Sequence, residues 1–192
     1  MDFKGAKKYI LERLEKELSP SLYYHGVHHT LDVYEVSIKI AEIENLSQEE
    51  KIIINTAALY HDAGFLFEYH DNERLAVRLV KEVLPRFGYN KKQMQAISEV
   101  ILSTQLQARP SSLLQKIMSD ADYDYLGRED NVVIANSLYT ELSESGFSFN
   151  DKEWNSMQIK FLNEHQYYTE SSIALRREKK WDYLKELKTL KF

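Results

Sequence analysis

The segment SQEEKIIINTAALYHDAG, residues 47–64, decides how this chain should fold. It opens with Ser47 and Glu50 in the spacing of a capping box, which starts a helix. From residue 52 onward the segment is apolar nearly all round, and a helix of that kind is buried in a protein core. A strand is the competing interpretation of residues 52–54, but the cap and the following Ala-Ala favour a helix. We therefore expect a central buried helix that runs to about His61.

The remaining chain predicts further helices and no sheet. Apolar residues recur at spacings of three and four almost throughout, and six glycines with three prolines leave turn signals widely spaced. Residues 105–112 are the least regular internal stretch. The other expected helices cover about residues 3–18, the histidine cluster at 25–29 to about 43, 72–87, 91–104, 111–123, 130–144, 151–166 and 170–190. The prediction is an all-α protein that forms one domain over residues 1–192.

Composition narrows the classes of function. The chain has no cysteine, which excludes a disulfide framework or a thiolate metal site. Its net charge of −5 argues against sequence-independent binding to a nucleic-acid polymer, which needs a basic surface. We see no signal peptide and no apolar stretch long enough for a membrane span, so we expect no membrane partner and a cytoplasmic location.

The segment YYHGVHHTLDVYEV, residues 23–36, holds three of the six histidines of the chain. Steps of three and four from His29 meet only apolar residues, and His25 lies one turn earlier on the same stripe. Steps from His28 meet only polar residues. His29 should therefore point inward and His28 to solvent. A buried histidine that makes a single hydrogen bond is the plainer alternative for His29.

Two further segments supply inward-pointing polar groups. His61 and Asp62 are adjacent at the end of the apolar central helix, where a carboxylate is costly to bury without compensation. The alternative is that Asp62 caps the next segment and accepts a hydrogen bond from His61. In KIMSDADYDYLGR, residues 116–128, Asp122 falls on a mainly apolar stripe, whereas Asp120 falls on a polar one. Together these positions predict one divalent metal site with nitrogen and oxygen ligands, formed by His29, His61, Asp62 and Asp122. Mn²⁺, Fe²⁺, Ni²⁺, Co²⁺, Zn²⁺ and Mg²⁺ all accept such ligands.

These motifs resemble the signature of the HD-domain superfamily of metal-dependent phosphohydrolases. The matching elements are His29 in HHT, His61 and Asp62 in LYHDAG, and Asp122 in DADYDYLGR. The resemblance spans about residues 20–130, and about residues 130–192 would form a C-terminal helical extension. Within it, FLNEHQYYTESSIALRREKKWDYLKEL, residues 161–187, resembles the extension of some stand-alone bacterial members. It implies a helical bundle around a central metal-bearing helix and hydrolysis of a phosphate ester or anhydride in a small phosphorylated molecule, with a nucleotide as one option. Asp62 would then both bind the metal and orient or deprotonate the attacking water.

The sequence departs from some branches of this superfamily. Branches with two metals supply extra histidines after the His-Asp pair, but this chain offers only His70 there and has Asn72 where a histidine is often found. We therefore expect one metal. Asp62 is followed by AGFLF, without the acidic residue of the branches that act on deoxynucleotide monophosphates or guanosine alarmones. Two rival functions stay open: a binding or regulatory module with little turnover, and a di-iron oxygenase, which would need more histidines than His70 and His165.

Other side chains are candidates for contact with water or substrate. Glu73 points inward from the predicted helix at 72–87 and would either position water or substrate or pair with an arginine. Thr104, His165 and Arg177 are candidates for substrate binding, each with a structural alternative: a frayed helix end, a core histidine and a snorkelling arginine. His25 is a candidate for substrate contact beside the metal. The basic final helix would either cover the site or form a homodimer contact.

Overall fold

The computed structural model describes residues 1–106 and 108–191, and every regular element in this part of the chain is a helix. The predicted all-α fold is confirmed. The irregular stretch expected at residues 105–112 includes Gln107, which lies outside the described residues. The α-helices are α1 (Phe3–Glu17), α2 (Val27–Ile43), α3 (Gln48–Tyr60), α4 (Asn72–Val83), α5 (Lys91–Leu102), α6 (Leu113–Asp122), α7 (Asn131–Glu144), α8 (Asp151–Glu164) and α9 (Glu170–Thr189). Three short 3₁₀ helices join them: η1 (Ala63–Leu66), η2 (Leu84–Phe87) and η3 (Asp124–Gly127).

One predicted helix is divided in the structure. The spacing predicted a single helix over residues 72–87, but α4 ends at Val83 and η2 follows directly. Pro85 lies in the first turn of η2 and has no N–H to continue the α-helical ladder. A 3₁₀ turn that ends at Gly88, with φ of 71°, completes the segment.

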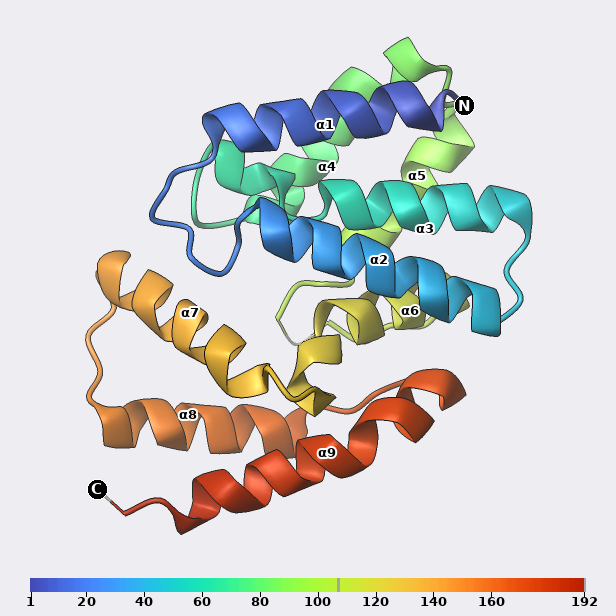
Figure 1. Ribbon diagram of the computed structural model, residues 1–192. Coiled ribbons are helices and arrows are strands. Elements are labelled where there is room, and N and C mark those ends of the chain that lie inside the picture. Colours follow the sequence, from blue (N-terminus) through green and yellow to red (C-terminus); the bar gives the residue numbers. More distant parts are fainter. Residues whose placement is uncertain (107, 192) are drawn as a thin grey trace.

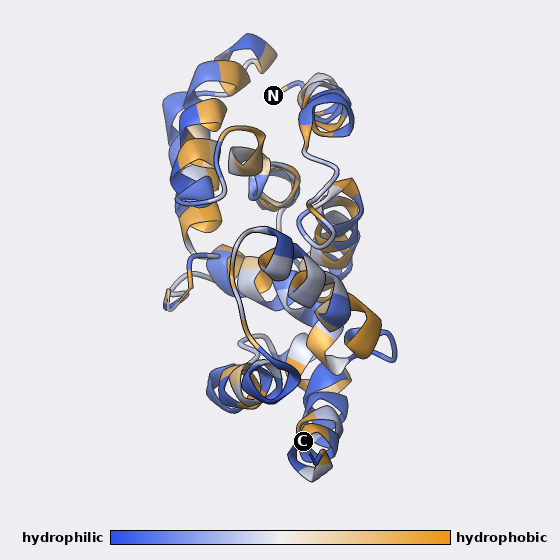
Figure 2. Ribbon diagram, turned by 90° about the vertical axis from the view of Figure 1, so that its left-hand side faces the viewer, coloured by the Kyte–Doolittle hydropathy of each residue, from blue (hydrophilic) through white to orange (hydrophobic). Residues whose placement is uncertain are grey.

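The central helix is α3, as the sequence predicted. Ser47 and Glu50 form both hydrogen bonds of the capping box at its start. Ile54, Ala57 and Ala58 are 0% exposed. The helix packs against α1, α2, α5 and α6 (Figure 1), and residues 53–60 are buried apart from half-buried Asn55. In Figure 2 the exposed sides of the helices are mainly hydrophilic and the hydrophobic sides turn inward.

A second, smaller cluster of buried residues lies under the C-terminal helices. It joins Tyr24 before α2 to residues of η3, α8 and α9: Tyr125, Leu126, Leu162, Tyr183, Leu184 and Leu187. Helices α7, α8 and α9 lie together on the side of α2 and α6 that faces away from α1 (Figure 1). The HD-like core and the C-terminal extension are therefore joined by shared apolar packing.

Asp120 fixes the start of α9. Steps of three and four along the sequence, which we call the stepping test, placed Asp120 on a polar stripe, yet the residue is 0% exposed. Its carboxylate accepts hydrogen bonds of 2.8 Å from the backbone N–H groups of Tyr168 and Thr169 and one of 2.7 Å from the Thr169 hydroxyl. The polar stripe of α6 is thus covered by the C-terminal segment rather than by solvent, and Asp120 takes no part in the predicted metal site.

Within the described part of the chain, none of the helices has the length and apolar character that crossing a membrane requires.

The burial of α3 predicts a large cost for shortening a side chain there. Ile54→Ala should lower the free energy of unfolding by about 2–5 kcal/mol, because it leaves a cavity in a closed core. Ile43→Ala is the matched control, since Ile43 is 54% exposed at the end of α2 and should change stability by less than about 0.5 kcal/mol. Urea unfolding followed by circular dichroism measures both, and equal losses would contradict a central α3.

Candidate metal centre and its cavity

The first turn of α2 separates the two adjacent histidines. Gly26 caps the helix in an extended conformation, and α2 begins at Val27. His29 is buried at 6% exposure, and His28 is exposed. The prediction from the apolar stripe is confirmed for both residues.

The end of α3 directs His61 and Asp62 to the same place. Nδ1 of His61 lies 2.8 Å from the carbonyl oxygen of Ala58, which leaves Nε2 free to face the site. Asp62 makes no side-chain cap to the segment that follows it. Gly64 lets η1 meet the start of α4 closely, since a Cβ there would lie 1.9 Å from the carbonyl oxygen of Asn72.

Four donor atoms converge from α2, the end of α3 and the end of α6. Nε2 of His29 lies 3.1 Å from Oδ1 of Asp122, 3.5 Å from Oδ2 of Asp62 and 3.4 Å from Nε2 of His61. Nε2 of His61 lies 3.0 Å from Oδ2 of Asp62 and 3.7 Å from Oδ1 of Asp122. Even without Asp62, the ligand atoms of His29, His61 and Asp122 all lie within 4.8 Å of one another, close enough to hold one metal ion. The structure therefore brings together all four predicted ligands.

The donor set fits a divalent cation. Ligands bound about 2.0–2.2 Å from one ion lie about 3–3.5 Å from each other, which is close to the observed spacing. Oδ2 of Asp62 is buried and has no hydrogen-bond partner in the described part of the chain. The Nε2 atoms of His29 and His61 also face each other at 3.4 Å, where a proton or a cation between them is favourable. A metal ion would satisfy all of these groups at once.

Without a metal, a proton partly replaces that positive charge. Burial opposes a charged imidazole at His61, but the carboxylates of Asp62 and Asp122 outweigh it and raise the pKa of His61 to about 9. Burial likewise opposes a charged carboxylate at Asp62, and the facing His61 still holds the pKa of Asp62 below its usual range. The centre is therefore electrostatically arranged to hold a cation in a largely buried site.

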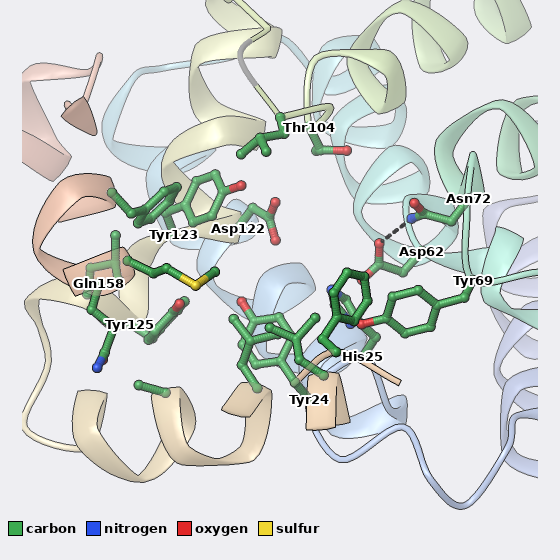
Figure 3. Close-up of a pocket in the computed structure, with 18 of the residues that line it drawn as sticks. Tyr24, His25, Asp62, Tyr69, Asn72, Thr104, Asp122, Tyr123, Tyr125 and Gln158 are labelled. Atoms are coloured by element: carbon green, nitrogen blue, oxygen red, sulfur yellow. Dashed lines mark hydrogen bonds between the residues drawn. The ribbon is translucent and has the colours of Figure 1, made fainter. Parts of the chain in front are cut away.

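Two residues at the start of α4 lie beside the ligands. Nδ2 of Asn72 donates a hydrogen bond of 3.1 Å to Oδ1 of Asp62 and so fixes the orientation of this carboxylate (Figure 3). Glu73 lines the same cavity. Burial, with Asp62 and Asp122 nearby, raises the pKa of Glu73 above the usual value for a carboxyl group.

His25 is held by Glu141, a residue that the sequence analysis missed. Glu141 comes from α7 and is 0% exposed. Its carboxylate accepts hydrogen bonds from the backbone N–H groups of Tyr24 (2.8 Å) and His25 (2.9 Å), from the hydroxyl of Tyr69 (3.1 Å) and from Nδ1 of His25. Burial opposes the charged imidazole, but the bond to Glu141 prevails and raises the pKa of His25. Glu141 follows Leu138 by three residues, so the stepping test that selected Asp122 could have found it.

A cavity of about 570 Å³ opens beside the metal ligands. The side chains of Asp62 and Asp122 face each other at its edge, and Tyr24, Tyr69 and Tyr123 lie around them (Figure 3). Its far wall is formed by side chains of α7 and α8. The cavity thus lies between the core helices and the C-terminal extension.

The predicted substrate residues divide into two groups. His25 and Thr104 line the cavity, although the Thr104 hydroxyl donates to the carbonyl of Ile101 at 2.8 Å, as at an ordinary helix end. Arg177 is exposed on α9 and does not line the cavity. His165 ends α8 outside the cavity, where burial and Lys180 lower its pKa to about 3, and it packs as a neutral ring against Tyr123 and Tyr167.

Comparison with known proteins identifies the family to which this helical fold belongs. The HD domain family matches residues 26–125, which is more than half of the chain. The chain belongs to the HD domain family. No curated protein matches the chain.

Several solved structures share the fold over nearly the whole chain. Bacillus subtilis YpgQ is 21% identical, with a TM-score of 0.68 over 98% of this chain and 96% of its own. A predicted HD superfamily hydrolase from an uncultured Thermotogales bacterium is 21% identical, with a TM-score of 0.63 over 95% and 87%. A Lactobacillus plantarum protein is 16% identical, with a TM-score of 0.69 over 97% and 95%. The C-terminal extension is therefore part of the shared fold.

The geometry predicts which histidines hold metal. His61→Ala and Asp62→Ala should lose bound metal, because each removes one donor from a group of four. His28→Ala is the control and should retain metal, since His28 is exposed and faces away from the site. Elemental analysis of protein reconstituted with Mn²⁺ and then desalted measures this. Equal loss in the His28 variant would contradict the assignment of faces on α2.

The pKa of His61 predicts how the stability of metal-free protein depends on pH. Folding raises the pKa of His61 from 6.5 to about 9, so the protonated imidazole stabilises the folded state. This stabilisation is fully present below pH 6.5 and is lost as pH rises through about 9. The contribution is about 3 kcal/mol. The test compares urea unfolding of chelator-treated wild type and His61→Gln at pH 6 and pH 9, so that other titrating groups cancel. A wild-type advantage that is no larger at pH 6 than at pH 9 would refute the prediction.

Proposed function

We propose that this protein is a metal-dependent phosphohydrolase that acts on a small phosphorylated molecule through one divalent ion. The observation that carries the proposal is the convergence of four buried donor atoms, from His29, His61, Asp62 and Asp122, at the edge of a cavity of about 570 Å³. A cavity of that size suits a small molecule. Membership of the HD domain family supports hydrolysis as the reaction.

A divalent ion in this centre would polarise a phosphate oxygen and acidify a water molecule. The side chains of the protein supply the rest. Asp62 has its Oδ1 fixed by Asn72, and its Oδ2 faces the ligand group without a hydrogen bond. This arrangement lets Asp62 orient the attacking water. Glu73, on the same cavity wall, is placed to accept the proton of that water.

His25 is the second side chain that we assign to the substrate. It lines the cavity and stacks on Phe65, with ring centroids 4.3 Å apart. Glu141 holds the ring from the other side, so its orientation is fixed before a ligand binds. A ring held in this way positions a hydrogen bond to the phosphate or to the leaving oxygen at little entropic cost.

A nucleotide is one candidate substrate. A second structure of YpgQ, which aligns with this chain at 19% identity, was solved in complex with ADP. Aromatic rings of Tyr24, Tyr123 and Tyr125 in the cavity would suit a stacked base. The rival interpretation, a binding module with little turnover, keeps the same centre and differs only in the rate of hydrolysis.

The di-iron alternative finds less support. His70 lines the cavity, but His165 lies outside it. Asn72 uses its amide to bind Asp62 at the position where branches with two metals often have a histidine. We therefore favour a single metal.

Hydrolysis should depend on Glu73. With Mn²⁺, Co²⁺, Ni²⁺ or Mg²⁺ added, we expect phosphate or 4-nitrophenol release from at least one member of a panel of nucleotides, sugar phosphates and 4-nitrophenyl phosphate esters. Glu73→Gln should lower kcat for that substrate by about 10² or more, because it removes the proton acceptor. Its bound metal should stay at the wild-type level.

Glu82→Gln on the same helix is the matched control, because the Glu82 side chain is 63% exposed and pairs with Arg86 at the surface. It should keep the wild-type kcat. A Glu73 variant with normal kcat would remove this residue from the mechanism. No release from any member of the panel by metal-loaded protein would favour the binding module.

A further inference from the structure

The cavity beside the metal ligands contains very little positive charge. No lysine or arginine is among the described residues that line it. Besides tyrosines, its ionisable lining groups are carboxyls and histidines: Asp62, Asp71, Glu73, Asp122, His25 and His70. A divalent ion would offset the two aspartate ligands, and half-buried Glu73 adds a further carboxyl group to the lining, whereas Asp71 is exposed to solvent. His25 can carry a positive charge, but it already pairs with the buried carboxylate of Glu141, so a phosphate group with two or more negative charges would be poorly compensated there.

The wall opposite the metal ligands is apolar. Helices α7 and α8 contribute Ala135, Leu138, Leu142, Trp154, Met157 and Phe161. The polar side chain on this wall, Gln158, already accepts a hydrogen bond of 2.7 Å from the hydroxyl of Tyr183. Burying a charged or strongly hydrated group against such a wall is unfavourable, whereas burying an aromatic ring is favourable.

We infer that the substrate is a phosphodiester with a single negative charge that carries an aromatic or other apolar group, rather than a phosphomonoester or a polyphosphate. The inference rests on the proposed hydrolase function and narrows its substrate class. The phosphate would lie at the metal ligands, and the apolar group would lie on the wall formed by α7 and α8. Among nucleotides, only those whose phosphate is a diester meet this requirement.

The reaction is ordinary hydrolysis of the diester. The water oxygen forms a new bond to phosphorus, and the bond from phosphorus to one ester oxygen breaks. One proton of water finally resides on the released alcohol. The products are a phosphomonoester and an alcohol. Because the phosphomonoester can carry a second negative charge, the same shortage of positive charge would favour its release.

Three synthetic esters with the same leaving group test the inference. They are phenyl 4-nitrophenyl phosphate, ethyl 4-nitrophenyl phosphate and 4-nitrophenyl phosphate, with ATP as a fourth compound assayed by phosphate release. In Mn²⁺-loaded protein we expect kcat/KM for the phenyl diester to exceed that for each of the other three by at least tenfold. Higher kcat/KM for the monoester or ATP would overturn the inference and leave the hydrolase function standing. No turnover of any compound would count against the proposed function itself.

Binding gives a measurement that does not depend on turnover. Calorimetry should give diphenyl phosphate a Kd at least tenfold lower than that of phenyl phosphate, because the two differ in charge and in one ring. Equal affinities, or tighter binding of phenyl phosphate, would overturn the inference even if the protein proves inactive.

A pair of charge variants tests whether the α8 wall causes this preference. Met157 lines the cavity and is 48% exposed, so a lysine fits there without entering the core. Met157→Lys should reduce the preference for diphenyl phosphate over phenyl phosphate at least threefold. Val133 lies on α7 outside the cavity and is 68% exposed. Val133→Lys should leave the ratio of the two dissociation constants unchanged. An unchanged ratio in the Met157 variant, or an equal change in both variants, would overturn the assignment of the wall.

Discussion

Two carboxylates and two imidazoles are buried where three helices meet, and the arrangement around them is governed by the free-energy cost of that burial. Asp62 and Asp122 are 7% and 9% exposed, and the histidines that face them are no more exposed. Carboxylates in such a place need a positive charge close by, because little solvent reaches them. A proton on His61 supplies part of it, and a divalent ion would supply all of it. The helices around α3 hold the donor atoms at the spacing that such an ion requires.

The surrounding elements keep this arrangement rigid. The carbonyl of Ala58 selects the nitrogen with which His61 faces the site, and Asn72 fixes one oxygen of Asp62. Gly64 allows η1 and α4 to approach so closely that Asn72 can reach its partner. Each of these contacts restricts the conformations of a metal-ligating side chain before a metal binds. Less conformational entropy is therefore lost on binding.

Much of the fold and of the metal centre was predictable from the sequence, because helical periodicity reports which face is buried. The stepping test placed His28 outside and His29 inside, and it selected Asp122. It gave no warning that Asp120 is buried too, because the face that holds Asp120 is covered by a segment about 50 residues further along the chain. It also extended α4 past Val83 to residue 87, where Pro85 changes the helix type. The substrate candidates were harder, since Arg177 and His165 lie on helices whose position relative to the cavity no local pattern determines.

Glu141 has a consequence for the cooperativity of the molecule. Its carboxylate binds two main-chain N–H groups immediately before α2, the helix that carries His29, and it does so from α7. The orientation of the first metal-bearing helix and the docking of the C-terminal helices are therefore linked equilibria, and such linkage is reciprocal. A cation that orders the start of α2 strengthens the docking of α7 by the same free energy with which docked α7 strengthens cation binding. The family match ends at residue 125, but the set of contacts to which a bound cation would be coupled extends beyond it to α7.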